Sequence, residues 1–178
     1  MRAALLVIDM QIALIDMGYQ AKEVLACVSG LIARARDAGV PVVHVQHHHA
    51  SYAPLMAGAP TWRIHPDVAP VPGEAVIGKT ASDAFHDTSL ASELQRRGVK
   101  RLVVTGMQTE HCVDTTCRRA LSLGFDVTLV ADGHTTCDGL LTAVDVIRHH
   151  NALLPGLAHP DHHVTVVPGR DVRFEETS

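Results

Sequence analysis

Hydrophobic residues fall into six short runs that alternate with amphipathic segments along the chain. The runs are rich in valine, leucine and isoleucine, and they predict strands at 3–9, 41–46, 74–78, 101–106, 125–132 and 162–168. The segments between them follow helical spacing and predict helices at 20–38, 88–98, 112–123 and 136–153. Strands that are apolar along their whole length are covered on both faces. The pattern therefore predicts an α/β fold of three layers, α/β/α, around a six-stranded parallel sheet.

The ends of the predicted helices carry their own signals. Gly39, Gly98 and Gly124 follow three of the helices, as helix C-terminal capping favours. Thr135 and Asp138 have the spacing of a capping box that would open the fourth helix. These boundaries support the assignment of alternating strands and helices.

Composition narrows the class of protein. The chain has 178 residues, 47% of them hydrophobic, which suits a single domain spanning 1–178. A net charge of −4 and only 3% aromatic residues disfavour a nucleic-acid surface. Asp9 and Asp16 interrupt the apolar N-terminal stretch, and no run approaches the roughly 20 residues that cross a bilayer. We expect a cytoplasmic protein without membrane or nucleic-acid partners.

Cysteines and histidines give no metal or disulfide pattern. The four cysteines lack a CxxC pair, so free thiols are expected in a reducing compartment. Thirteen histidines are present, but neighbours such as those at 47–49 point in different directions, and the ligand spacing of a metal site is missing. We expect no metal and no other cofactor.

Reactive side chains follow several predicted strands at one edge of the sheet. Parallel α/β sheets bind ligands at the carboxyl ends of their strands. Asp9, Lys79 and Cys112 each follow a different strand there. Each residue alone also has a structural interpretation, but their convergence indicates a site. Asp132, at the end of the fifth predicted strand, is interpreted as a brace for a turn.

The chemistry of these three groups is that of a cysteine nucleophile. Cys112 lies where a helix is predicted to begin, and a helix N-terminus together with the cation of Lys79 is expected to lower the pKa of the thiol. Asp9 can accept the thiol proton and return it to a leaving amine. Backbone N–H groups in the 107–112 turn can bind an oxyanion.

Three stretches resemble the isochorismatase-like cysteine hydrolase superfamily, which includes nicotinamidases and N-carbamoyl amidohydrolases. They are "LLVIDMQ" (5–11), "GKTASDAFHDTSL" (78–90) and "VTGMQTEHCVDTTCRRALSLGFDVTLVADGHTT" (104–136). The resemblance implies a six-stranded parallel sheet, a catalytic triad drawn from these stretches, a small-molecule substrate and a homo-oligomeric assembly. The triad residues that it implies are Asp9, Lys79 and Cys112.

The resemblance also implies the surroundings of the triad. A cis peptide bond is implied between Met107 and Gln108, with the backbone N–H groups of Gln108 and Cys112 forming the oxyanion hole. The substrate pocket is assigned to Gln11, Phe85, His111 and Trp62. For two of these residues two interpretations stay open. His111 either touches the substrate or faces solvent. Trp62 either covers the substrate or anchors the loop at 47–73, whose length is typical of a binding loop.

The expected function is a cysteine hydrolase that cleaves a small amide, carbamoyl or ureido C–N bond through a thioester. Nicotinamidases carry an Asp-x-His metal motif after the second strand, where this chain reads "HVQHHHA" (44–50), so a metal-bound nicotinamidase is disfavoured. Isochorismatase-type hydrolysis of a vinyl ether is an alternative, although it does not need Cys112. A non-catalytic α/β binding module is another. A nucleotide-binding oxidoreductase lacks the required GxGxxG after the first strand.

Overall fold

A computed structural model gives the structure of the protein and describes residues 2–174. Six strands form one parallel sheet: β1 (Ala3–Ile8), β2 (Val42–His47), β3 (Ala75–Lys79), β4 (Arg101–Met107), β5 (Asp126–Thr135) and β6 (Val164–Val167). The helices are α1 (Ile12–Ile15), α2 (Ala21–Asp37), α3 (Leu90–Arg96), α4 (Asp114–Ser122) and α5 (Ala143–Leu153). The predicted fold class is confirmed.

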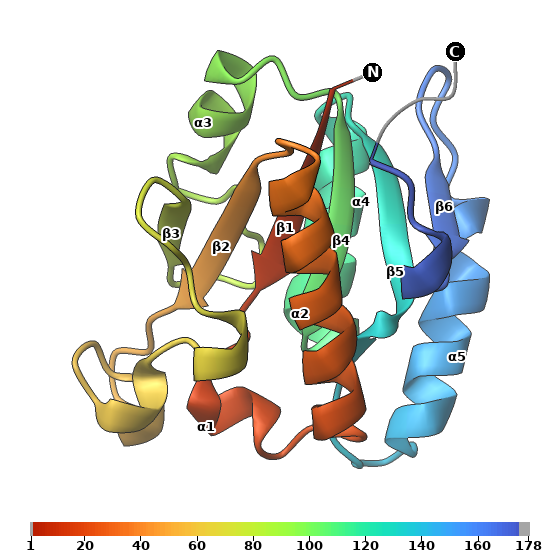
Figure 1. The fold of residues 1–178 in the computed structure, drawn as a ribbon. Helices are drawn as coiled ribbons and strands as arrows, with labels where there is room; N and C mark the ends of the chain where they lie inside the picture. Colours follow the sequence, from red (N-terminus) through yellow and green to blue (C-terminus); the bar gives the residue numbers. More distant parts are fainter. Residues whose placement is uncertain (1, 175–178) are drawn as a thin grey trace.

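Each face of the sheet has its own hydrophobic core, because successive side chains of a strand point to opposite faces. In β1, Leu5 and Val7 join the core beneath α2, whereas Leu6 and Ile8 join the core beneath α3 and α4. Figure 1 shows these layers, with α2 in front of the sheet, α3 and α4 behind it and α5 along the side of β5 and β6. Burial on both faces explains why the central strands are mostly apolar.

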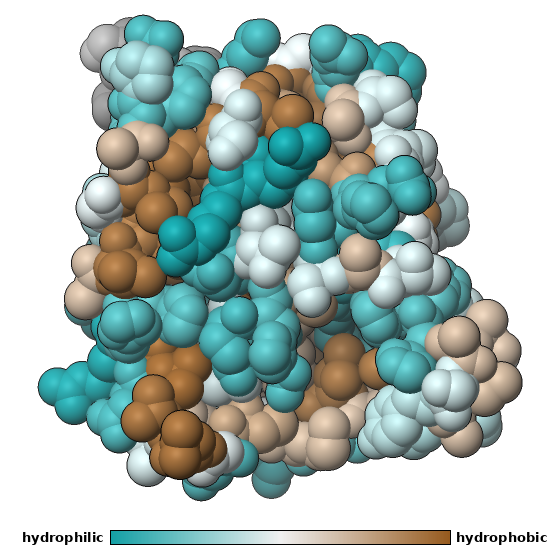
Figure 2. Space-filling view, turned by 180° about the vertical axis from the view of Figure 1, so that it is seen from behind, coloured by the Kyte–Doolittle hydropathy of each residue, from teal (hydrophilic) through white to brown (hydrophobic). Residues whose placement is uncertain are grey.

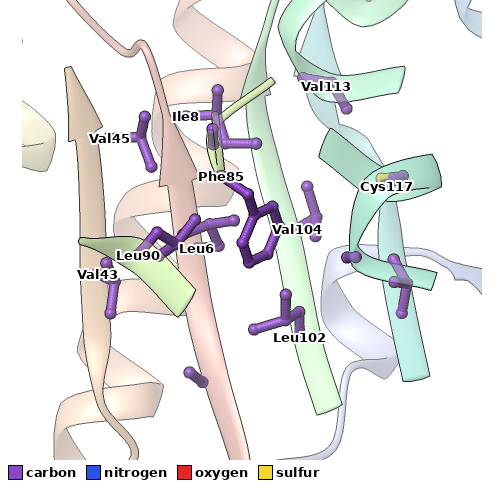
Figure 3. Packing of buried hydrophobic residues seen from close by; sticks show 14 of the residues in the cluster. Leu6, Ile8, Val43, Val45, Phe85, Leu90, Leu102, Val104, Val113 and Cys117 are labelled. Atoms are coloured by element: carbon purple, nitrogen blue, oxygen red, sulfur yellow. The ribbon is translucent and has the colours of Figure 1, made fainter. Parts of the chain in front are cut away.

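The core behind the sheet packs the segment after β3 against the strands. Figure 3 shows the Phe85 ring among Leu6, Leu90, Leu102 and Val104. Seen from outside, this face is covered mostly by hydrophilic side chains, with hydrophobic residues gathered in a few separate areas (Figure 2).

The order of the strands, β3-β2-β1-β4-β5-β6, places a reversal between β1 and β4. The chain moves outward from β1 to β3 and then returns to the other side of β1, so the carboxyl ends of β1 and β4 flank the usual ligand crevice of such sheets. At this point Gly106 of β4 pairs with Ile8 of β1. Gly106 has a φ of +125°, and a Cβ there would collide with the carbonyl oxygen of Ile8. Only glycine permits this close approach.

Most predicted boundaries agree with the structure within a few residues, and the three capping glycines at 39, 98 and 124 have positive φ. The fourth helix is the exception, because α5 begins at Ala143 and not at 136. Thr135 still belongs to β5, and its hydroxyl donates to the carbonyl oxygen of Tyr19 at 2.6 Å. The cap of α5 is Thr142, which accepts a hydrogen bond from the N–H of Asp145.

The loop after β2 is irregular as predicted, although it contains three short 3₁₀ turns. No helix in the described part of the chain is both long and apolar enough to cross a membrane.

Candidate active site

Asp9, Lys79 and Cys112 meet at the carboxyl edge of the sheet. Asp9 directly follows β1, Lys79 ends β3, and Cys112 follows β4 by a short turn. The Lys79 ammonium nitrogen (Nζ) lies 2.7 Å from Oδ2 of Asp9 and 3.1 Å from Sγ of Cys112. The structure therefore brings together all three side chains that the sequence indicated.

Cys112 lies inside one π-helical turn, Thr109–Val113, which joins β4 to α4. Thr109 at the start of this turn is buried, and its hydroxyl lies 2.9 Å from Nδ1 of His134. Val113 at its end is part of the core behind the sheet. Both ends of the turn are therefore held by buried contacts, which fix the position of the thiol between them.

The Lys79 side chain, which carries the cation of the site, is 0% exposed. Its ammonium donates to the carbonyl oxygen of Ala81 at 2.9 Å and lies 3.1 Å from Nδ1 of His47. With Asp9 and Cys112, four polar atoms therefore surround a group that has three protons. The nitrogen is fixed between the carboxylate and the thiol.

The Asp9 carboxylate is also fully buried. Burial raises the pKa of Asp9, and the adjacent Lys79 ammonium opposes this effect. Apart from the contact of Oδ2 with the Lys79 ammonium at 2.7 Å, neither carboxylate oxygen has a partner among the described residues, so the charge of Asp9 is balanced by this ion pair. A carboxylate with a raised pKa and no partner besides this ion pair is a suitable proton acceptor.

The thiol of Cys112 corrects one expectation from the sequence. Its pKa is raised to about 12 and not lowered, because burial and the negative charge of Asp9 outweigh the Lys79 cation. The N-terminus of a regular helix does not compensate, since α4 begins only at Asp114. Cys112 is therefore a protonated thiol at neutral pH, and a nucleophilic thiolate requires transfer of its proton to a neighbour.

The Met107–Gln108 peptide bond is cis. It lies between the buried Met107 at the end of β4 and the turn that carries Cys112. The side-chain amide of Gln108 lies 3.6 Å from Sγ of Cys137. An oxyanion hole made by the backbone N–H groups of Gln108 and Cys112 stays a prediction.

Gln11 and Trp62 fasten the loop after β2 to the site. The Gln11 side chain donates to the carbonyl oxygens of His47 and Trp62 and accepts from the N–H of His47. The indole N–H of Trp62 also donates to the carbonyl oxygen of His47, at 3.1 Å. Of the two interpretations of Trp62, the structure supports anchoring. Direct contact of Gln11 or Trp62 with a substrate stays a prediction.

The other two residues assigned to the pocket differ in exposure. Phe85 is 8% exposed and stacks on Phe125, with ring centroids 6.0 Å apart, so its ring belongs to the core. The side chain of His111 is 60% exposed, and its Nε2 lies 3.9 Å from Oε1 of Glu110. His111 faces solvent beside the thiol. A substrate contact by either residue stays a prediction.

His47 contacts the site, although the sequence patterns do not single it out. His47 and Lys79 are direct neighbours in the register of β2 and β3. Finding this contact requires the strand order, which places β2 between the strands that carry Lys79 and Asp9. Within residues 2–174, no cluster of three or more His, Cys, Asp or Glu side chains is arranged to hold a metal ion.

The parallel α/β sheet thus carries a carboxylate, an ammonium and a thiol together at its switch point. A sequence model of the isochorismatase domain matches residues 3–152. The chain belongs to the isochorismatase family.

Relatives of known name agree with this assignment. The chain is 44% identical over 138 residues to a streptothricin hydrolase of Streptomyces noursei, a match that covers 76% of this chain and 50% of the relative. It is 31% identical over 169 residues to the ureidoacrylate amidohydrolase of Variovorax paradoxus, covering 73% of this chain and 67% of that protein. The chain thus spans about half the length of the streptothricin hydrolases that it matches.

Solved structures share the fold. A crystal structure of an isochorismatase-family protein from Chromobacterium violaceum superimposes with a TM-score of 0.85 at 31% identity, over 96% of this chain and 91% of the other.

Proposed function

We propose that the protein is a cysteine hydrolase that cleaves the C–N bond of a small amide, carbamoyl or ureido substrate through a thioester acyl-enzyme. The observation that carries this proposal is the buried Lys79 ammonium, 2.7 Å from the Asp9 carboxylate and 3.1 Å from the Cys112 thiol. The activities for which its relatives are named, on streptothricin and on a ureidoacrylate, support a substrate of this class.

The reaction begins with a neutral thiol beside an ion pair. As Sγ of Cys112 attacks the substrate carbonyl carbon, its proton moves to Asp9, whose raised pKa favours proton uptake. Backbone N–H groups of the 108–112 turn stabilise the oxyanion. The C–N bond then breaks, and the leaving amine or ammonia takes the proton from Asp9.

Water completes the cycle. Asp9, again a carboxylate, removes a proton from a water molecule that attacks the thioester carbon. The acid product leaves, and the proton returns to the sulfur of Cys112. Throughout these steps Lys79 offsets the negative charge that moves between the carboxylate and the sulfur, a role that is strong because Asp9 and Lys79 are buried.

A substrate screen tests this proposal. The protein is incubated with streptothricin, a ureidoacrylate, nicotinamide and simple N-carbamoyl amino acids, and release of ammonia or amine is measured. A substrate found in this way is then mixed with the protein and quenched in acid within milliseconds to seconds. Intact mass spectrometry should show the acyl group attached to Cys112.

Two matched variants make the result decisive. Cys112→Ala should show neither turnover nor added mass, whereas Cys27→Ala should show both. Undiminished turnover by Cys112→Ala would contradict covalent catalysis by this thiol. Absence of hydrolysis of every amide and ureide in the screen would count against the proposal and leave the vinyl ether and binding-module alternatives.

The proposal includes a homo-oligomer in a cytoplasmic setting, as expected from the resemblance and from the sequence. Light scattering coupled to size-exclusion chromatography measures the assembly. A monomer at micromolar concentration with full activity would contradict the oligomeric part of the proposal alone.

A further inference from the structure

We propose that His47 is a positioning residue of this site: its Nδ1 accepts a hydrogen bond from Lys79 and so holds the ammonium between Asp9 and Cys112. This inference rests on the proposed function of these three residues. It adds a fourth side chain, supplied by β2, to groups that come from β1, β3 and the turn after β4.

The strand order explains why such a residue is needed. Lys79 belongs to β3 and Asp9 follows β1, with β2 between them. The Lys79 side chain must therefore pass the carboxyl end of β2 to reach the carboxylate. His47 is the last residue of β2 and pairs in register with Lys79, so its ring lies on that path, with Nδ1 3.1 Å from Nζ.

The number of N–H donors on the Lys79 ammonium explains why His47 is needed as an acceptor. Lys79 has three N–H donors. The Asp9 carboxylate and the carbonyl oxygen of Ala81 engage two of them, at 2.7 and 2.9 Å. Both remaining neighbours lie at 3.1 Å, but the sulfur of a protonated thiol is a weak acceptor. His47 is therefore the partner of the third proton in the resting site, which matters because an unpaired polar group is costly when buried.

The backbone of His47 is itself held in place by three hydrogen bonds. Its N–H donates to the side chain of Gln11, and its carbonyl oxygen accepts from both Gln11 and the Trp62 indole. The three distances are 2.8, 3.0 and 3.1 Å. These bonds fix the backbone from which the imidazole projects, so Gln11 and Trp62 act on the site through His47.

The His47 imidazole is suited to accept a hydrogen bond from Lys79 and not to remove a proton from the thiol. Burial, with the nearby Lys79, His49 and His48, lowers the pKa of His47 to about 4, so the ring is neutral at physiological pH. Because Nδ1 accepts from Lys79, the ring proton resides on Nε2. None of the described hydrogen bonds joins His47 to Cys112, so the imidazole has no direct contact through which to take the thiol proton.

Three single variants of the full chain test this role. His47→Leu keeps a similar volume and removes the acceptor. His47→Asn places an amide oxygen near the position of Nδ1 and restores it. His163→Leu removes an exposed histidine at the opposite, amino end of the sheet and serves as the control.

The first readout needs no substrate. The rate of alkylation of Cys112 by iodoacetamide is measured against pH by peptide mass spectrometry. In His47→Leu the curve should move to higher pH, because the cation that stabilises the thiolate is less well placed. His47→Asn and His163→Leu should follow the unmodified protein.

The second readout uses the substrate found in the screen. His47→Leu should lower kcat on the order of 10–100-fold, the usual effect of removing a residue that orients a site group, with KM nearly unchanged. His47→Asn should recover most of the loss. A change confined to KM would overturn the inference in favour of substrate contact, and unchanged alkylation and kcat in His47→Leu would overturn it outright.

The two proposals fail in different ways. Without any hydrolysis, a shifted alkylation curve in His47→Leu that Asn reverses still supports the link between His47 and Lys79. Hydrolysis that is indifferent to His47 leaves the proposed function standing and removes this inference. Should His47→Leu not fold, His47→Gln replaces it, because its amide reaches toward the position of Nε2 and should not rescue as Asn does.

Discussion

Two thiols in this protein, Cys112 and Cys27, have similar pKa values but very different surroundings. Burial raises the pKa of each to about 12, and each has a carboxylate as neighbour. The cations differ. Lys79 lies 3.1 Å from Cys112, whereas the guanidinium of Arg34 donates to the carbonyl oxygens of Gly169 and Val172 and has only a minor effect on Cys27.

The two carboxylates differ as well. Asp132, 3.7 Å from Cys27, is exposed and accepts the N–H of Gly169 at 2.6 Å. It therefore holds the distant 3₁₀ turn Gly169–Asp171 and not the local turn that the sequence suggested, because β5 continues to Thr135. Asp9 is buried and uncommitted apart from its ion pair. A cavity of about 380 Å³ lies beside Cys27, between α2 and α5, so hollow space alone does not mark the reactive thiol. Cys112 is distinguished by two neighbours: the buried Lys79 ammonium, and the Asp9 carboxylate, whose one partner among the described residues is that ammonium.

The largest expected effect separates the two thiols by substitution. Cys112→Ala should lower kcat by on the order of 10⁴-fold or more, as removal of a nucleophile does in comparable enzymes. Cys27→Ala should change kcat very little. The measurement is steady-state hydrolysis of the substrate from the screen, with both variants checked for folding by circular dichroism.

A large effect on stability is expected at Lys79. Lys79→Met leaves the buried Asp9 without its counter-ion, and breaking such a pair costs about 3–5 kcal/mol in the free energy of unfolding. The double variant Lys79→Met with Asp9→Asn should regain much of this stability because no charge remains buried. It should regain no activity. Urea unfolding measures the first result and hydrolysis the second; a fully stable Lys79→Met would contradict the pairing.

A smaller effect concerns His134, which connects the two regions. It lines the cavity beside Cys27 and bonds to Thr109 of the turn that carries Cys112. Burial lowers the pKa of His134 to about 4, opposed by its hydrogen bond with Asn151. His134 therefore takes up a proton near pH 6.5 in the unfolded chain, but only near pH 4 in the folded protein.

The stability that results is complete above pH 6.5 and is lost as the pH falls toward 4. Its size is on the order of 3 kcal/mol, from about 2.5 pH units at 1.4 kcal/mol each. Urea unfolding at a series of pH values measures this dependence. His134→Gln should make the dependence shallower between pH 6.5 and 4 by the contribution of one proton, while His47, whose pKa is also lowered to about 4, keeps its own contribution. An unchanged slope in that variant would contradict the account.

The smallest effect is expected from chelation. Exhaustive treatment with EDTA and a stronger chelator should leave hydrolysis unchanged, since the described residues hold no metal-binding cluster and the Asp-x-His motif is missing. Loss of activity that zinc, iron or manganese restores would instead assign a catalytic role to the histidines at 44–49.

The fold was readable from the sequence because the signal is local. Strands that are buried on both faces are mostly apolar along their length, and glycines end several helices. The start of α5 was misjudged because Thr135 and Asp138 fit a capping box locally, while the extension of β5 to Thr135 depends on pairing with β4.

The site was only partly readable. Asp9, Lys79 and Cys112 could be found because each follows a strand and carries a reactive group. The raised pKa of Cys112 could not, since it depends on burial in three dimensions. His47 was missed for a similar reason: its contact with Lys79 arises from the register in which β2 and β3 pair, which the sequence does not give.

The central claim, that Asp9 and Cys112 act as one unit, is tested most directly by a double-mutant cycle on kcat with Asp9→Asn, Cys112→Ala and the combined variant. The thiol has no route to thiolate without the carboxylate, and the carboxylate has no proton to accept without the thiol. Each single substitution should therefore cost several orders of magnitude, and the double variant should be little worse than either. Losses that multiply in full would show that the two residues act independently and would contradict the mechanism.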